Sequence, residues 1–287
     1  MRLNALTVGI ALSCGLLSFS CRPTSALAPD RPSSARPSTP PASLHSFALT
    51  QNKLQGLMRH ARGITVKVIA GDNWGSGILV RQQGQRYTVL TNEHVLWMGD
   101  RYTVQTSDGK QHLARRGASG AFGKNDLGLL EFDKGSSAGS YPVAVLGCSL
   151  ELSAGTPVYA AGFPLPLTEY SSKGFKFTAG SISLIPAKAL EGGYQVGYSN
   201  DIEKGMSGGP VLNAKGEVIA VNGMHQEPLW GDPYVFQDGS KPKSSLFQMF
   251  SRSSWAIPME TAFRTTALTA AHLSRQCPVP NIKQAQG

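Results

Sequence analysis

A serine set among glycines is the residue of this chain best suited to chemistry. Ser207 lies in the string Gly-Met-Ser-Gly-Gly-Pro at 205–210. Glycines permit a tight turn whose backbone amides converge on one point while the hydroxyl stays exposed, which is what a nucleophilic serine requires. Turns of this composition also reverse chains without doing any chemistry. Ser207 is therefore a candidate nucleophile that needs a base and a carboxylate from elsewhere.

Two other residues can supply these groups. His94 follows a predicted strand at 87–91, and Asp126 precedes the apolar run 127–130. Taken singly, His94 fits a half-exposed polar residue and Asp126 fits a turn residue. Together with Ser207 they form the set that acyl transfer needs: a hydroxyl, an imidazole that takes its proton, and a carboxylate that fixes the imidazole tautomer. We therefore expect the three side chains to meet.

The elements that would position these residues are mostly short strands. The chain has 287 residues, 41% of them apolar, with 32 glycines and 18 prolines, which excludes disorder throughout and favours strands joined by turns. Two similar sets of about six strands predict an all-β fold of two six-stranded antiparallel β-barrels that meet along a cleft. A helix is predicted at 259–274. The predicted strands are 64–69, 77–80, 87–91, 102–106, 111–115 and 127–132, then 157–161, 176–185, 194–198, 210–212, 218–222 and 254–257.

With its motifs in the order His, Asp, Ser, the chain resembles the trypsin-like serine peptidases of the chymotrypsin fold, above all the bacterial exported members. The motifs are Gly-Ser-Gly at 75–77, Thr-Asn-Glu-His-Val at 91–95, Asp-Leu-Gly-Leu-Leu at 126–130, the string at 205–210, and Trp-Ala-Ile-Pro at 255–258. The resemblance covers about residues 60–275. Too few residues follow Leu273 for the C-terminal PDZ-type module that some members carry, so we expect none.

This resemblance implies a serine endopeptidase that hydrolyses peptide bonds through an acyl-enzyme. It makes His94 the general base and then the acid, Asp126 its orienting carboxylate, and Ser207 the nucleophile. The backbone amides of Gly205 and Ser207 would form the oxyanion hole. The implied partners are protein or peptide substrates, and the implied mechanism needs no cofactor.

Two positions bear on activation and specificity. Met206 stands where digestive-type members have an aspartate that pairs with a freshly cut N-terminus, so we expect activity without such a cleavage. Asp201 lies six residues before Ser207, where trypsin-type enzymes carry the aspartate that binds Arg or Lys. Asp201 therefore predicts a preference for a basic residue before the cut, with Asn222 and Gly223 as further substrate-binding residues. The alternative for Asp201 is a plain loop carboxylate.

The segment 223–254 is longer than the family usually has at this place. It carries His225, Trp230, Tyr234, Phe236 and Phe247, which could form an exosite or lid, or could bury themselves in a decorated loop.

The N-terminus of the chain indicates export. Residues 1–28 resemble a secretory signal peptide, because Arg2 precedes an apolar run that is too short for a membrane span. Cys21 raises the alternative of a lipid-modified N-terminal cysteine, the only membrane attachment that we expect. We predict a secreted or periplasmic protein, or else a lipoprotein. The expected organisation is a Pro/Ser-rich linker at 29–48, a peptidase domain at 49–277 with barrels at about 60–140 and 150–258, and a tail at 278–287.

Cysteine and charge patterns add little chemistry of their own. Removal of the signal leaves Cys148 and Cys277, whose spacing alone fits a disulfide or two unrelated thiols. In the resembled fold the terminal helix packs near the crossing between barrels, which favours the Cys148–Cys277 disulfide. No Cys-x-x-Cys or His-rich cluster suggests a metal. The basic residues that give the net charge of +9 are scattered along the chain, so the sequence predicts no nucleic-acid partner.

A rival interpretation is a catalytically idle relative that uses the same two barrels as a binding module, because a fold does not guarantee an activity. Reaction of Ser207 with a serine-directed probe distinguishes the two.

Overall fold

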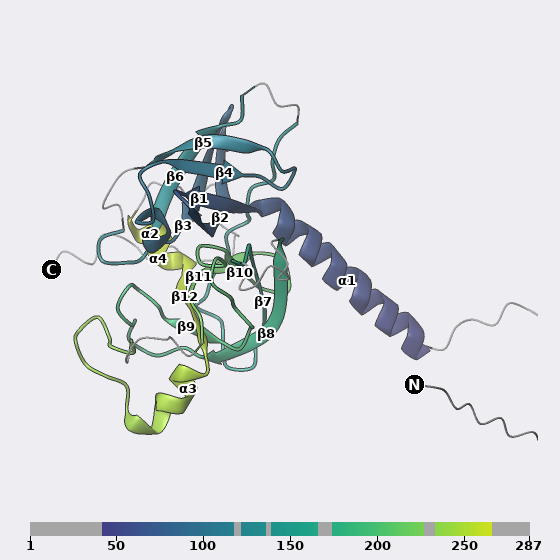
Figure 1. Cartoon of the computed structure of the whole chain (residues 1–287). Coiled ribbons are helices and arrows are strands. Elements are labelled where there is room, and N and C mark those ends of the chain that lie inside the picture. Colours follow the sequence, from purple (N-terminus) through teal and green to yellow (C-terminus); the bar gives the residue numbers. More distant parts are fainter. Residues whose placement is uncertain (1–41, 118–121, 136–138, 166–173, 227–232, 266–287) are drawn as a thin grey trace, which may run out of the picture. The chain divides into compact units, whose positions relative to one another are not determined.

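The computed structural model describes residues 42–117, 122–135, 139–165, 174–226 and 233–265 (Figure 1). The predicted signal peptide, most of the predicted linker, Trp230, Cys277 and the tail lie outside these ranges. From Ser46 onward the described residues belong to one compact unit.

The first barrel is a closed antiparallel sheet with the strand order β1-β2-β3-β6-β5-β4 (Figure 1). Its interior holds alternating aliphatic side chains such as Val66, Val68 and Val89, which are fully buried. This alternation is what a strand with one face on a core requires. Its strands are β1 (Thr65–Ala70), β2 (Asn73–Gln83), β3 (Arg86–Thr91), β4 (Tyr102–Gln105), β5 (Gln111–Arg116) and β6 (Gly128–Asp133).

The second barrel is also closed and antiparallel, with the order β10-β11-β12-β9-β8-β7. Val158, Val196 and Ile219 are among its fully buried core residues. The predicted fold class, two six-stranded antiparallel barrels followed by a helix, is therefore confirmed. The strands are β7 (Pro157–Gly162), β8 (Lys176–Leu184), β9 (Val196–Tyr198), β10 (Pro210–Leu212), β11 (Val218–Met224) and β12 (Ser254–Pro258).

Five helical segments accompany the strands of the described ranges. The longest, α1, begins inside the predicted linker, because no proline occurs between Pro41 and its end at Ile64 and its residues are compatible with a helix. Its C-terminal turns bury Leu57, Ala61 and Ile64. None of the described helices is both long and apolar enough to cross a membrane. The segments are α1 (Ala42–Ile64), α2 (Glu93–Leu96), η1 (Ser244–Leu246), α3 (Phe247–Ser251) and α4 (Met259–Thr265).

The crossing between the barrels is tied to α4 by one buried carboxylate. Glu260, in the first turn of α4, accepts hydrogen bonds from the backbone N–H of Ser149 at 2.6 Å, from Ser149 Oγ at 2.8 Å and from Cys148 Sγ at 3.0 Å. The Glu260 residue is only 5% exposed. This carboxylate therefore joins the crossing to the C-terminal helix, whereas the predicted partner of Cys148, Cys277, is not among the described residues.

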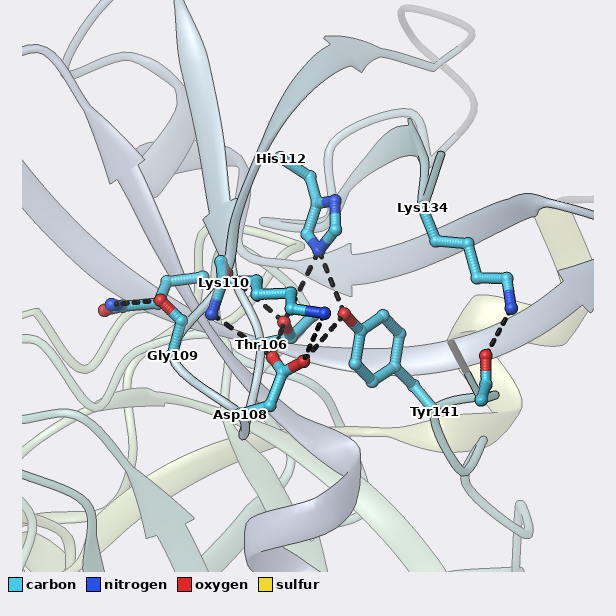
Figure 2. Close-up of polar contacts among 9 residues, drawn as sticks. Thr106, Asp108, Gly109, Lys110, His112, Lys134 and Tyr141 are labelled. Atoms are coloured by element: carbon cyan, nitrogen blue, oxygen red, sulfur yellow. Dashed lines mark hydrogen bonds and ion pairs between the residues drawn. The ribbon is translucent and has the colours of Figure 1, made fainter. Parts of the chain in front are cut away.

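A polar cluster lies beside the β4–β5 hairpin (Figure 2). Asp108 accepts hydrogen bonds from Thr106 Oγ1 at 2.6 Å and from Tyr141 Oη at 3.2 Å. His112 Nε2 lies 3.1 Å from Tyr141 Oη, and its ring stacks on Phe132. The cluster thus combines a nearly buried imidazole with a carboxylate that is held by several donors.

The described part of the long segment 223–254 (the insertion) packs much of its aromatic surface onto barrel two. Tyr234 and Phe250 are buried and contact the fully buried Trp255 of β12. Phe236 forms an isolated antiparallel bridge with Leu190. These aromatic residues serve the core, as the decorated-loop interpretation expected, while Phe247 stays 47% exposed.

Candidate active site

His94 and Asp126 are brought together by the pairing of β3 with β6. The register places Thr91 opposite Gly128, so the residues just beyond these strand ends are neighbours. His94 Nδ1 lies 2.6 Å from Asp126 Oδ2, and the His94 backbone N–H donates to Asp126 Oδ1 at 2.8 Å. Asn92 Nδ2 donates to the Asp126 carbonyl at 2.8 Å. One carboxylate therefore holds both the ring and the backbone of His94.

Ser207 lies in a turn that only glycine accommodates at two positions. Gly205 and Gly208 have φ angles of +90° and +85°. A Cβ atom at Gly208 would lie 2.1 Å from the Ser76 carbonyl oxygen, and one at Gly205 would lie 2.6 Å from the Phe163 carbonyl oxygen. The turn thus needs glycine both for its backbone angles and for close approach to its neighbours.

Strand β2 fixes this turn beside α2. The Ser76 N–H donates to the Ser207 carbonyl at 2.7 Å. A Cβ at Gly75 would lie 2.6 Å from Val95 Cγ2 and 3.2 Å from the Ser207 carbonyl oxygen, so these two groups flank the same glycine. Val95 is the neighbour of His94. The structure therefore brings the segments that carry Ser207 and His94 into contact with one glycine of β2.

The Ser207 hydroxyl is engaged by β11. Ser207 Oγ donates to the Gly223 carbonyl at 3.2 Å. Among the described residues, His94 Nε2 has no hydrogen-bond partner, and the His94 side chain is 35% exposed. The serine hydroxyl must therefore turn away from Gly223 before it can donate to His94.

The backbone N–H groups of Gly205 and Ser207 are oriented by hydrogen bonds to the carbonyls of the preceding residues, Lys204 and Met206. The Leu165 N–H donates to the Lys204 carbonyl at 2.7 Å, and Asn222 Nδ2 donates to the Met206 carbonyl at 2.9 Å. In a trans peptide the N–H points opposite to the preceding C=O. The N–H groups of Gly205 and Ser207 thus face away from these donors, and neither has an acceptor within the described ranges.

Met206 is buried in barrel two. Its side chain is fully shielded from solvent and belongs to the same cluster as Val211 and Ile219. The Met206 N–H also donates to the Glu203 carbonyl at 3.1 Å. The turn is therefore anchored by local packing and hydrogen bonds.

The three predicted substrate-binding residues have different settings. The Asp201 side chain is 80% exposed, and its carboxylate accepts a hydrogen bond from Lys176 Nζ at 2.6 Å. Asn222 is fully buried, with its side chain turned inward to Met206 and to the hydroxyl of Tyr198. Only Gly223, through its carbonyl, lies against Ser207.

Sequence reasoning missed Tyr194 as a site residue. Its hydroxyl donates to Asp126 Oδ2, the same oxygen that faces the imidazole. Burial, followed by the negative charge of Asp126, raises the pKa of Tyr194 well above its ordinary value. The only signal in the sequence was a strand-forming tyrosine at the start of the predicted strand 194–198, which carries no hint of this contact. No group of three or more metal-ligating side chains occurs in the described part of the chain.

Comparison with known proteins agrees with this architecture. The sequence model of the trypsin-like peptidase domain matches residues 75–221. Serine protease HTRA1 of Xenopus laevis is 32% identical over 158 residues, which are 52% of this chain and 30% of the relative. A probable periplasmic serine endoprotease DegP-like of Ectopseudomonas mendocina is 31% identical over 201 residues, 67% of this chain and 34% of the relative. The chain thus spans about a third of the length of these curated relatives.

Solved structures share the fold. Deg5 superposes with a TM-score of 0.55 at 20% identity, covering 78% of this chain and 98% of Deg5. The HtrA-type protease AlgW superposes with a TM-score of 0.53 at 22% identity, covering 73% of this chain and 60% of AlgW. The matched segment 75–221 includes His94, Asp126 and Ser207 and makes up half of the sequence. The chain belongs to the trypsin-like peptidase domain family.

Proposed function

We propose that this chain is a serine endopeptidase in which Ser207 is the nucleophile, His94 the general base and acid, and Asp126 the orienting carboxylate. The observation that carries this proposal is the double contact of Asp126 with His94, at 2.6 Å on the ring and 2.8 Å on the backbone, beside the Ser207 turn. A carboxylate on Nδ1 leaves Nε2 free to take a proton from a hydroxyl.

The chemistry proceeds through an acyl-enzyme. Ser207 Oγ attacks the substrate carbonyl carbon while its proton passes to His94 Nε2. His94 then returns that proton to the departing amine, the C–N bond breaks, and the acyl group stays on Ser207. Water then gives a proton to His94 and adds to the ester carbonyl carbon. The resulting tetrahedral adduct breaks its bond to Ser207 Oγ, which takes the proton back from His94, and the carboxylic acid product leaves.

The N–H groups of Gly205 and Ser207 would bind the oxyanion that forms at each addition. Both lack an acceptor among the described residues, and both are aimed by the bonds on Lys204 and Met206. Donors fixed in advance cost no reorganisation when the charge develops. Because Met206 packs into barrel two, we propose that the turn needs no newly cut N-terminus.

The Gly223 carbonyl can accept the backbone N–H of a bound peptide. It holds the Ser207 hydroxyl at 3.2 Å, so a substrate N–H that takes this acceptor would release the hydroxyl toward His94. Asp201 offers no comparable support for a basic preference, because it is exposed and already paired with Lys176. The residue before the cut is therefore to be read from a peptide-library digest.

Export is part of the proposal. It rests on the predicted signal peptide at 1–28 and on the word periplasmic in the names of the DegP-like relatives. The substrates would then be proteins or peptides outside the cytoplasm.

A fluorophosphonate probe tests the activity directly. We expect covalent labelling of the wild-type chain and complete loss of labelling in Ser207→Ala. Ser244→Ala, which removes an exposed hydroxyl in η1, serves as the matched control and should label normally. A folded wild type that neither labels nor cleaves a peptide library would contradict the proposal and favour the idle binding module.

A further inference from the structure

We propose that Tyr194 is a positioning residue for the triad, reaching from barrel two to fix the Asp126 carboxylate of barrel one. This inference rests on the proposed function, since it assigns a role relative to His94 and Asp126. The Tyr194 hydroxyl and the His94 imidazole share Asp126 Oδ2, while Oδ1 takes the His94 backbone N–H. The carboxylate is thus held on both oxygens.

The Tyr194 hydroxyl is held in place by the burial of its side chain. Tyr194 is 5% exposed, and its ring belongs to the core cluster shared by the two barrels. The raised pKa of Tyr194, caused first by burial and then by Asp126, keeps the phenol protonated and able to donate at working pH. A buried donor next to a partly buried carboxylate oxygen gives one fixed arrangement instead of several.

Gly223 leaves room for this hydroxyl. A Cβ atom at position 223 would lie 2.3 Å from Tyr194 Oη and 2.6 Å from its Cε1. The same Gly223 accepts the Ser207 hydroxyl through its carbonyl. The Tyr194 hydroxyl, the Asp126 carboxylate and the Ser207 hydroxyl therefore converge around one residue without a side chain.

The loop that carries Tyr194 is attached to the Asp126 segment at a second point. The Asp126 N–H donates to the Gly192 carbonyl at 2.8 Å, and Asn125 forms an isolated parallel bridge with Gly192. Gly192 has a φ of +74°, and a Cβ there would lie 2.9 Å from the Tyr194 ring. The loop approaches Asp126 with its backbone and its tyrosine together.

Hydrogen bonds between the insertion and the loop that carries Tyr194 support this loop. The Glu191 N–H donates to the Val235 carbonyl at 2.8 Å, and the Gln237 N–H donates to the Ala189 carbonyl at 3.0 Å. Gln237 Nε2 also donates to Asn125 Oδ1 at 3.2 Å. The described part of the insertion thus supports the loop that presents Tyr194, a use that differs from substrate recognition.

Tyr194→Phe tests the role because it keeps the ring and removes only the hydroxyl. We expect kcat for peptide hydrolysis to fall about tenfold, the scale of one hydrogen bond to a charged group, with KM within about twofold. Without this donor, Asp126 attracts a protonated imidazole more strongly, so the acidic limb of the kcat–pH profile should move to higher pH. Glu93 of α2 and Arg116 of β5, charged groups on neighbouring elements, pair with each other and are unchanged in the variant.

A readout that needs no turnover is the downfield proton NMR signal of His94 Nδ1–H, recorded in a Ser207→Ala background. Tyr194→Phe should move or broaden this signal. Tyr87→Phe is the matched control, because it removes another buried hydroxyl whose partner is the distant Tyr141 N–H, and it should leave the signal and kcat unchanged.

The outcomes separate this inference from the proposed function. If wild-type protein is active and Tyr194→Phe matches it in kcat, pH profile and proton signal, Tyr194 does not position the triad. A fall in kcat with unmoved profile and signal would reduce Tyr194 to core packing and also overturn the inference. If wild type fails to react with the fluorophosphonate probe, the proposed function fails, yet the proton signal still shows whether Tyr194 holds the His94–Asp126 pair.

Discussion

At the scale of single residues, the site depends on a few hydrogen bonds that aim backbone groups. Ser76 shows this most clearly. Its buried hydroxyl donates to the Gly205 carbonyl at 2.8 Å and accepts the Phe163 N–H at 2.8 Å. It therefore fixes the Gly205–Met206 peptide, which directly follows the Gly205 N–H that we assign to the oxyanion hole.

Ser76→Ala should lower kcat about tenfold with little change in KM, because the oxyanion donor next to it loses its support. Ser253→Ala is a matched control, since it also removes a buried hydroxyl bonded to a backbone carbonyl, that of Met249 at 2.8 Å, within the α3 region. Steady-state kinetics on both variants, with urea unfolding to verify folding, provides the measurement. Equal kcat values for the two variants would show that Ser76 does not aim the donor.

The local settings of Ser207, His94 and Asp126 could be predicted from the sequence, while their catalytic roles stay predictions. The turn around Ser207 is set by its own glycines, and His94 and Asp126 lie next to strand ends. Turns and strand ends depend on residues that are close in sequence, so a sequence pattern can locate them. Tyr194 was not predictable, since its contact with Asp126 spans 68 positions and two barrels. Asp201 was singled out by its spacing from Ser207, but spacing along a loop does not fix where a side chain points. The Asp201 carboxylate points to Lys176.

At the scale of elements, hydrophobic alternation located the strands well and their ends less well. The predicted strand 77–80 is the middle of β2, which runs from Asn73 to Gln83. Its first residues looked like a turn because they include Gly75 and Ser76, yet those residues pair with β1 and contact the Ser207 turn. From the sequence alone, a glycine that allows two segments to approach closely cannot be told from a glycine that allows a turn.

The β4–β5 cluster gives barrel one an acid-sensitive element (Figure 2). Burial lowers the pKa of His112, and the charge of Lys110 adds to this, while Asp108 opposes it. Burial pushes the pKa of Asp108 up, but hydrogen bonds from Thr106, Lys110 and Tyr141 outweigh it and leave the pKa lowered. In both groups the unfolded chain binds protons more readily than the folded one. Their stabilisation is therefore present above the unfolded pKa values and is lost as pH falls.

We expect the Tm to fall as pH drops from 7 to 5, through the ordinary histidine range near 6.5, with His112 contributing to this fall. His112→Gln should flatten this part of the Tm–pH curve. Burial also lowers the pKa of His225, so a smaller dependence should persist in the variant. A Tm–pH curve of His112→Gln as steep as that of the wild type would contradict the assignment to the cluster.

At the scale of the whole molecule, the proposed function requires the barrels to stay docked, since His94 and Asp126 come from one and Ser207 from the other. Glu260 contributes to this by joining the crossing segment at Ser149 to α4. Glu260→Ala would leave buried donors without an acceptor, which should lower the free energy of unfolding by about 2 kcal/mol. Urea titration followed by tryptophan fluorescence and by peptide hydrolysis measures this change, and both signals should be lost in one transition at a lower midpoint. Glu151→Ala, an exposed carboxylate on the same segment, should keep the wild-type midpoint, and a shared midpoint for both variants would show that the carboxylate does not clamp the crossing.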